Sequence, residues 1–340
     1  MNANANCRMA LGQTAGWRTI EMQNGLIRLI VLPDKGADLY QLVHVPTQVT
    51  VLCQSPWGLQ PPGAPPRDGS ADIEFQWNYG GGWQELFPSA HFACQYQGRA
   101  IPFHGEVATL PWSYAVQDES PAEVSVRLTV RCRQTPFELT RRMRLQRDQP
   151  TVFMEETVRN LSDAPAHFVW GHHCVVGEPF LEAGCRLHTP ARVLHTAPQL
   201  GEETASLEAG QTGRWPLARR RDGGLADLRH VPGPEAHTHD GAFLTDLAGG
   251  WAAVTNPRLN LTLSLHWDPT IFKWLVVWMP YGGCEAMPLQ GIYALGIEPW
   301  TARYNLERSL ANNTALELAG HASLSTGLQA TIQEGDWRGS

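Results

Sequence analysis

The sequence predicts an all-β protein whose antiparallel strands form a sandwich or a barrel. Several segments alternate apolar and polar residues with a period of two, which is the pattern of half-buried strands. Turn-forming residues recur between these segments, as in Pro33-Asp34-Lys35-Gly36 and Gly282-Gly283. No helical stripe is longer than about three turns, so helices are expected to contribute little to the fold.

The period-two alternation locates the expected strands along the chain. In Glu123–Arg133, for example, apolar residues occupy every second position from Val124 to Cys132. In chain order, the expected strands are Leu26–Leu32, Glu123–Arg133, Phe137–Leu145, Val152–Val158, Leu261–Leu265, Leu275–Trp278, Ala315–Leu318 and Leu328–Ile332.

Two stretches between these strands are irregular in composition. Gln54–Gly82 contains five prolines and ends in three glycines, which predicts a long surface loop. Leu200–Pro234 is rich in Gly, Arg and Glu, which predicts loops with short strands. Strands on both sides of each stretch need one another to close a sheet. We therefore expect a single domain over residues 16–335, preceded by an N-terminal segment over residues 1–15.

Composition and charge exclude several classes of partner. The chain has 340 residues and a formal net charge of 26 − 33 = −7, which gives no attraction to nucleic acid or anionic lipid. Its longest strongly apolar run, Trp274–Met279, is far shorter than the ~20 residues that cross a bilayer. No signal peptide is recognised, and the seven cysteines form no CxxC pair. We expect free thiols and a cytoplasmic location.

Four segments place titratable residues in settings typical of a cleft. They contain His104, the pair His172 and His173, the run from His237 to Asp240, and Glu298. Adjacent residues of a strand point to opposite faces, so only one of His172 and His173 can enter a given pocket. Glu298 follows an apolar strand and is closed by Pro299, and burial there is expected to raise its pKa toward the range of a general base.

Other interpretations of these residues remain open at this level. Histidines in β proteins are often packing residues, and the 13 tryptophans fit a core. Glu298 could pair with Arg303. His237 and His239 could bind a metal with Asp240, but a third well-spaced ligand is not obvious, so no metal is expected. The sequence contains no nucleophile elbow, P-loop, dinucleotide fingerprint or HExxH motif, so phosphoryl transfer, hydride transfer and serine-type hydrolysis lack support.

Taken in order, several short motifs resemble one known family. They are Asn24–Ala37, the Gly-rich Gly81–Pro88, Phe103-His104-Gly105 with Pro111-Trp112, His173 with Gly177, Asp240 with Phe243, and Leu295-Gly296-Ile297-Glu298-Pro299. From Gly16 to Ile332 the chain resembles a divergent member of the aldose 1-epimerase (galactose mutarotase-like) family.

This resemblance implies a large antiparallel β-sandwich, the galactose mutarotase-like supersandwich, with a sugar cleft on one face. Such isomerases interconvert the α and β anomers of a sugar without a cofactor. Glu298 is implied to take the proton of the anomeric hydroxyl, and His173 to protonate the ring oxygen. His104 is implied to hydrogen-bond near the ring oxygen, and Asp240 to hold sugar hydroxyls.

The chain also departs from the family pattern. Better-known members carry an arginine near the Gly-rich segment, and we expect Gln84 or His91 in that neighbourhood. Trp83 and Trp300 are expected to contact the sugar, although a glutamine is common where Trp300 stands. The implied partner is a small carbohydrate, and the protein is expected to be a monomer or homodimer.

Two other classes of function compete with a mutarotase. The first is a protein that binds sugar without converting it. The second is a different enzyme, either a lyase or hydrolase that uses Glu298 and Asp240, or a metal-dependent isomerase that uses His237 and His239. The acid–base trio His104, His173 and Glu298 favours the mutarotase, because a pure binding protein does not need it.

Overall fold

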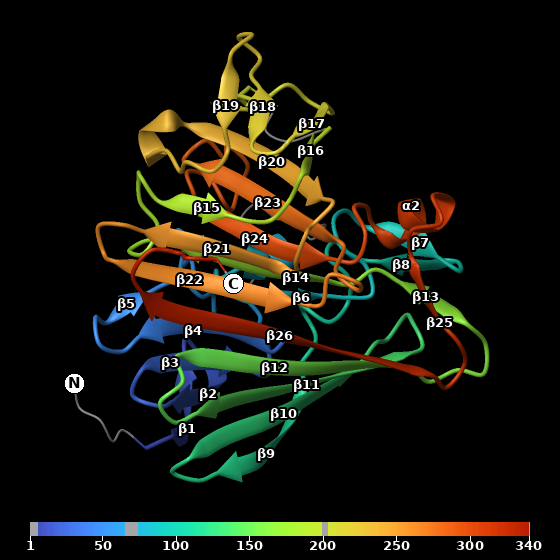
Figure 1. Ribbon diagram of the computed structural model, residues 1–340. Helices are drawn as coiled ribbons and strands as arrows, with labels where there is room; N and C mark the ends of the chain where they lie inside the picture. Colours follow the sequence, from blue (N-terminus) through green and yellow to red (C-terminus); the bar gives the residue numbers. More distant parts are fainter. Residues whose placement is uncertain (1–5, 65–73, 199–202, 340) are drawn as a thin grey trace.

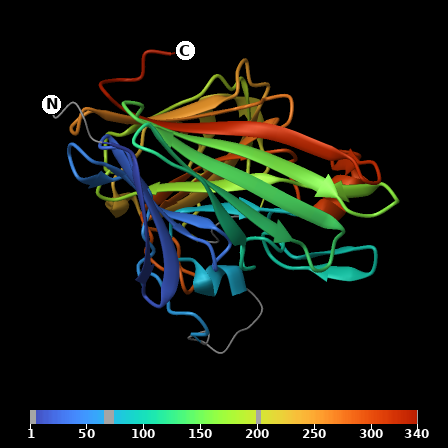
Figure 2. The ribbon, with the colours of Figure 1, turned by 90° about the horizontal axis from the view of Figure 1, so that it is seen from below.

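Strands dominate the computed structural model, which describes residues 6–64, 74–198 and 203–339. Two large antiparallel sheets pack face to face as two layers (Figures 1 and 2). The prediction of a large antiparallel β-sandwich is therefore confirmed. Among the described residues, no helix is long and apolar enough to cross a membrane.

The first sheet has twelve strands, in the spatial order β1 (Arg8–Thr14), β2 (Trp17–Gln23), β3 (Ile27–Leu32), β4 (Asp38–His44), β6 (Trp83–Leu86), β14 (Gly171–Gly177), β24 (Ala294–Trp300), β23 (Trp274–Tyr281), β20 (Thr238–Thr245), β16 (Val193–Thr196) and β17 (Thr212–Arg214), with β5 (Val49–Thr50) beside β4. The second sheet has eight strands, in the order β15 (Arg186–His188), β21 (Trp251–Asn256), β22 (Leu261–Trp267), β26 (Ser323–Glu334), β12 (Thr151–Asn160), β11 (Phe137–Gln146), β10 (Glu123–Arg131) and β9 (Ser113–Glu119).

Smaller elements decorate the two layers. The short strand pairs are β7 (Cys94–Tyr96) with β8 (Arg99–Ile101), β13 (Ala166–Phe168) with β25 (Leu316–Leu318), and β18 (Leu217–Arg219) with β19 (Leu225–Asp227). The helices are α1 (Glu74–Asn78), the 3-10 helix η1 (Pro234–Ala236) and α2 (Leu306–Ala311). α2 lies beside β7 and β8 at one end of the sandwich (Figure 1).

Each strand expected from the alternation pattern lies in a strand of the structure. Leu200–Pro234 contains the short strands β17, β18 and β19, as expected, and residues 199–202 are outside the described part. Gln54–Gly82 is not only a loop, because it contains α1, and residues 65–73 are likewise not described. Arg8–Thr14 was expected to precede the domain, but it forms the edge strand β1 and pairs with β2 along its whole length. The first sheet therefore includes residues of the expected N-terminal segment.

The central strands of the first sheet are buried on both faces. In β14, Cys174 and Val176 pack into the core between the sheets, whereas Val175 packs into a second hydrophobic cluster on the outer face. β24 repeats the pattern, with Leu295 and Ile297 in the core between the sheets. All seven residues of each strand are consequently buried. The outer face is the one that carries the candidate site.

A buried charged cluster ties the two sheets together beneath that site. Arg141 of β11 contacts Glu85 of β6 in the opposite sheet, and its Nε lies 2.8 Å from Glu156 Oε1 of the neighbouring strand β12. Glu156 Oε2 lies 3.1 Å from Nε2 of His172 in β14. All four side chains are nearly inaccessible to solvent.

Candidate active site

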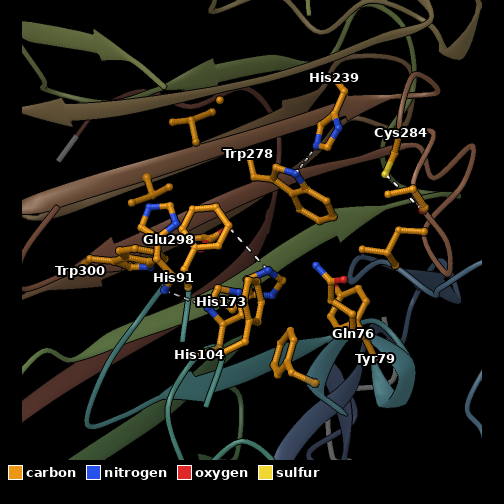
Figure 3. A pocket seen from close by; sticks show the side chains of 18 of the residues that line it. Gln76, Tyr79, His91, His104, His173, His239, Trp278, Cys284, Glu298 and Trp300 are labelled. Carbon is orange, nitrogen blue, oxygen red and sulfur yellow. Dashed lines mark hydrogen bonds and ion pairs between the residues drawn. The ribbon is translucent and has the colours of Figure 1, made fainter. Parts of the chain in front are cut away.

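A cavity of about 200 Å³ lies on the outer face of the first sheet. Its floor is formed by β14, β20, β23 and β24, and its walls by α1 and by residues 91–104 and 284–289. Figure 3 shows His104, His173 and Glu298 gathered on one side of this cavity. Most of the lining is apolar or aromatic, and the titratable side chains in it are Tyr79, His91, His104, His173, His239, Cys284 and Glu298.

Strand register brings His173 and Glu298 together. Gly171 pairs with Trp300 and Val175 pairs with Gly296, so His173 and Glu298 stand opposite each other on β14 and β24. His173 Nε2 lies 3.9 Å from Glu298 Oε1. His172 points to the other face, into the charged cluster. The two residues implied as acid and base, 125 positions apart (298 − 173), thus face one cavity.

Gln84 fixes the tautomer of His173. Gln84 Nε2 donates to the Gly81 carbonyl at 2.8 Å, so its Oε1 faces His173 Nδ1 at 3.2 Å. An amide oxygen only accepts hydrogen bonds, which places the imidazole proton on Nδ1. The lone pair of Nε2 therefore points toward Glu298.

His104 occupies a tight turn that is locked to His91. The backbone N–H of His104 donates to the His91 carbonyl at 2.8 Å, and the His91 N–H donates to His104 Nδ1 at 3.1 Å. His104 has φ 61°, and the next residue, Gly105, has φ 82°. A Cβ at Gly105 would lie 2.4 Å from the Phe87 carbonyl oxygen, so only glycine fits there. Since Nδ1 accepts a hydrogen bond, the ring proton of His104 is on Nε2.

Burial favours the uncharged forms of Glu298 and of three histidines in this cavity. It raises the pKa of Glu298 well above its usual range. It lowers the pKa of His173 to about 3 and that of His91 to about 4. Burial, assisted by the neighbouring histidines, also lowers the pKa of His104 well below its usual range. Burial therefore favours the protonated form of Glu298 and the neutral forms of these three histidines.

Two further polar groups in the cavity wall are buried without a partner. Neither the Tyr79 hydroxyl nor the Trp300 indole N–H has a hydrogen-bond partner of good geometry among the described residues, although Trp300 lies close enough to the Glu298 carboxyl to oppose the rise in its pKa. Buried donors of this kind are normally satisfied, so they are available to a ligand. Two residues before Glu298 on the same strand, Gly296 leaves room for the Glu298 carboxyl, because a Cβ there would lie 2.4 Å from Glu298 Oε1.

Aromatic rings surround the acid–base residues. The ring of Phe75 lies 4.6 Å from that of His104, and the ring of Tyr79 lies 5.3 Å from that of His173. On the opposite side, Trp278 Nε1 donates to His239 Nε2 at 2.9 Å. Flat aromatic walls can stack on the C–H face of a sugar ring.

Several sequence expectations for substrate contacts do not match this geometry. Trp83 lies in the core between the sheets, and its Nε1 donates to His172 Nδ1 at 3.2 Å. Asp240 also points away from the cavity, because its carboxylate accepts from the Ser206 and Leu207 N–H groups at 3.0 Å. Gln84 contacts His173 rather than the cavity. His91 and Trp300 do line it.

The other roles that the sequence left open for these residues do not fit their positions in the structure. Because Asp240 faces the core, Glu298 is the only carboxylate that lines the cavity among the described residues. The set His237, His239 and Asp240 does not converge on a metal site. The described residues with suitable ligand spacing are Glu85, Glu156 and His172, but Arg141 already contacts both carboxylates. Arg303 does not pair with Glu298, since its guanidinium stacks on Phe243 at 4.9 Å.

Sequence reasoning missed the contribution of α1 and of one histidine. Phe75 and Tyr79 come from the stretch expected to be a surface loop, where no periodic signal marks five helical residues. His239 was considered only as a metal ligand. His239 and Asp240 are neighbours on β20, so their side chains point to opposite faces of the strand and only one of them can face the cavity.

Comparisons with known proteins agree with the fold. The family model described as a domain of unknown function (DUF4432) matches residues 14–332. Among curated proteins, none matches this chain in sequence.

Similar solved structures include a provisionally assigned aldose 1-epimerase from Klebsiella pneumoniae, with 17% identity, 95% of this chain and 82% of that chain covered, and a TM-score of 0.74. A galactose mutarotase-like protein from Clostridium acetobutylicum has 16% identity, coverage of 97% and 100%, and a TM-score of 0.66. A galactose mutarotase related enzyme from Lactobacillus acidophilus has 15% identity, coverage of 94% and 100%, and a TM-score of 0.61. At these identities the likeness establishes the fold, and the resemblance noted in the sequence is confirmed as that of a divergent relative.

Proposed function

Because the chain belongs to the family described as a domain of unknown function (DUF4432), and shares its fold with mutarotase-like proteins, we propose that it is a carbohydrate mutarotase. It interconverts the anomers of a monosaccharide by opening and closing the ring. The observation that carries this proposal is the approach of His173 Nε2 to Glu298 Oε1, at 3.9 Å, in the wall of a small cavity.

The reaction requires one proton donor and one proton acceptor. On ring opening, Glu298 takes the proton of the anomeric hydroxyl and His173 Nε2 gives a proton to the ring oxygen. The bond between the anomeric carbon and the ring oxygen breaks, leaving an aldehyde. Rotation about the neighbouring C–C bond presents the other face of the aldehyde. Both protons then return, and the ring closes as the other anomer.

The protonation state of the empty cavity fits one step of this cycle. After ring opening, Glu298 is protonated and His173 is neutral, which is the distribution that burial favours. With the cyclic sugar bound, the same single proton resides on His173, and sugar hydroxyls donate to the Glu298 carboxylate and stabilise it. The pair thus holds one proton in both states, and no proton is exchanged with solvent.

The remaining polar residues position the sugar. His104 presents Nε2–H to the ring oxygen region, since its Nδ1 is occupied by the His91 N–H. The Tyr79 hydroxyl and the Trp300 N–H are available to other sugar oxygens. Gln84 acts on the sugar only through His173, whose ring it orients.

Exchange spectroscopy of sugar anomers by NMR tests the proposal. We expect the protein to accelerate exchange of at least one monosaccharide above the buffer rate. Glu298→Gln and His173→Ala should each lower that rate by roughly 10²–10⁴-fold, because each removes one partner of the proton transfer. His321→Ala is the matched control, since this exposed histidine pairs with Asp163 at 2.8 Å outside the cavity.

Two outcomes would contradict a mutarotase. If Glu298→Gln exchanges anomers as fast as the unsubstituted protein, the acid–base assignment is wrong. If a sugar binds saturably but its anomers exchange at the buffer rate, the protein is a sugar-binding protein, which was the competing class.

The cellular setting follows the same proposal. All seven cysteines are free, and six of them are buried, which is consistent with a reducing cytoplasm. The proposed ligand is one small carbohydrate, and the proposed assembly state is a monomer or homodimer.

A further inference from the structure

Arg303 is a partly buried cation beside the cavity, and no carboxylate among the described residues acts on its charge. It lies just after Trp300, the last residue of β24, and its guanidinium carbon is 4.9 Å from the ring centroid of Phe243, which lines the cavity. The buried Nε of Arg303 makes no hydrogen bond to any described residue. Buried donors are normally satisfied and desolvated cations are normally paired, so this side chain is equipped to bind an anion.

The surroundings of Arg303 bring a second positive charge rather than a negative one. The guanidinium carbon of Arg308 lies 4.0 Å from the ring centroid of Tyr304, and that of Arg303 lies 5.3 Å from the same centroid. Burial lowers the pKa of Arg303, Tyr304 raises it and Arg308 lowers it. The described lining of the cavity contains no lysine or arginine. Positive charge is therefore offered to a ligand on the side of the cavity where Phe243 lies.

The charge of Arg303 already acts on the wall of the cavity. The ring centroid of His91 lies 5.4 Å from that of Phe243 and 4.8 Å from that of Trp300. Burial, assisted by the charge of Arg303, lowers the pKa of His91 to about 4. The same two causes lower the pKa of His195, which pairs with Phe243 from β16. A cation that acts on a residue of the lining also acts on a charged ligand beside that residue.

Strand register gives the separation between the acid–base residues and this cation. Glu298 pairs with Val276, and Val276 pairs with Phe243, so two strand spacings separate Glu298 from Phe243. Two spacings amount to roughly 10 Å across the sheet. This separation is of the order of the length of one substituted monosaccharide. A sugar with its anomeric carbon between His173 and Glu298 can therefore carry a charged substituent toward Arg303.

We propose that Arg303 is a specificity-determining residue that binds an anionic group of the sugar, such as a carboxylate or a phosphate. The substrate is then an acidic or phosphorylated monosaccharide. This inference rests on the proposed function for the placement of the sugar. Arginine suits the role, because its planar guanidinium donates hydrogen bonds to such oxygens in a fixed geometry.

The test uses trios of sugars that share one ring configuration and differ in charge. D-glucose, D-glucuronate and D-glucose 6-phosphate form one trio, and the galactose and mannose series supply two more. Binding is measured by quenching of tryptophan fluorescence, since Trp278 and Trp300 line the cavity. Inorganic phosphate is a separate arm, which shows whether an anion binds without a sugar. Anomer exchange is measured independently by NMR.

We expect one anionic member of the preferred trio to bind at least about tenfold more tightly than the neutral member, and this difference to shrink as KCl is added. Arg303→Met keeps an apolar stem against Phe243 and removes the charge. It should abolish the difference and change the affinity for the neutral sugar less than about twofold. Arg303→Lys keeps the charge and should retain part of the preference. Arg192→Met is the matched control, because this exposed arginine pairs with Asp246 at 3.8 Å.

The inference is overturned if the neutral sugar binds as tightly as both anionic members in every trio, or if Arg303→Met weakens all three sugars equally. It is also overturned if inorganic phosphate alone binds as tightly as the sugar phosphate, since the anion site would then be independent of the sugar. Exchange of neutral anomers with no preference for an anionic sugar contradicts only this inference, whereas preferential binding without exchange contradicts only the mutarotase activity. Failure of every sugar to bind contradicts both.

Discussion

At the scale of single residues, the site depends on which nitrogen of each imidazole carries the proton. Gln84 sets this for His173, and the His91 backbone sets it for His104. Neither partner touches the sugar in the proposed complex. Such partners control the direction of the lone pair and the pKa of the histidine, so their substitution should change the pH dependence of the reaction as well as its rate.

Gln84→Glu should shift the acid limb of the pH–rate profile. In the unsubstituted protein, the pair formed by His173 and Glu298 takes up a second proton only as the pH falls toward the His173 pKa of about 3. Activity should therefore persist at pH 5. A carboxylate at position 84 favours the imidazolium and should move this acid limb to higher pH by roughly one to two units. The measurement is kcat/KM for anomer exchange between pH 4 and 9.

Gln84→Met is the control for this prediction. Met has a similar length, carries no charge and accepts hydrogen bonds only weakly, so it should lower the rate without moving the acid limb. Equal profiles for the Glu and Met variants would show that Gln84 does not act through the protonation of His173.

At the scale of secondary-structure elements, the site is held by strands whose two faces contact different parts of the molecule. On β14, His173 faces the cavity, and on β6 Gln84 contacts His173 from the same side, while their neighbours Glu85 and His172 face the charged cluster in the core. The cluster is centred on Arg141 of the opposite sheet. It therefore fixes, from behind, β14, which carries His173, and β6, which carries Gln84.

Arg141→Met should be strongly destabilising. It leaves Glu85 and Glu156 buried without their counterion, which costs on the order of 3–5 kcal/mol. Arg142→Met is the control on the same strand, because Arg142 is partly exposed and pairs with Glu123 and Glu155 at the surface. Its expected cost is about 0–1 kcal/mol. Urea unfolding measures both, and similar losses in the two variants would contradict a special role for the core cluster.

At the scale of the whole molecule, the large first sheet is unusual in being covered on both faces along its centre. One face packs on the second sheet, and the other face packs on α1, β7, β8 and α2 through the second hydrophobic cluster. The cavity interrupts this outer layer. Burial of three histidines in its wall therefore links the stability of the whole sandwich to pH.

We expect the free energy of unfolding to fall as the pH drops from 7 to 5. His91, His104 and His173 have lowered pKa values in the folded state, so below about pH 6.5 the unfolded chain binds three protons that the folded protein does not. Glu298, with a raised pKa, opposes this by one proton above about pH 4.5. For these four cavity residues the difference is up to two protons, which gives a slope of up to roughly 2–3 kcal/mol per pH unit, and the buried His172, whose pKa burial lowers but the carboxylates of Glu85 and Glu156 raise overall, opposes it.

The urea midpoint at pH 7, 6 and 5 measures this dependence. His173→Gln removes one of the three protons and should make the dependence shallower. Glu298→Gln removes the opposing proton and should make it steeper. A midpoint that is constant over this range would mean that the cavity histidines are not kept neutral by folding.

The sequence by itself determined the strands and the relation between neighbours on a strand. The period-two alternation located β10, β11 and β12, because each has one face in the core and one in solvent. The same geometry required His172 and His173 to face apart. The sandwich architecture and the approach of His173 to Glu298 were expected from a family resemblance, and the anomer chemistry is proposed from the same resemblance.

The packing of the two sheets, and not a local pattern, determines which face of β20 enters the cavity and which face of β6 lies in the core. In these strands hydrophobic residues lie on both faces, so the alternation of polarity that marks an inside and an outside is lost. Asp240, Trp83 and Gln84 were all expected to contact the sugar, whereas the structure places His239 in the cavity, Trp83 in the core and Gln84 behind His173. The role of the five-residue helix α1 likewise depends on its packing over the sheet. The strands that it covers are distant in sequence, so no local pattern predicts these contacts.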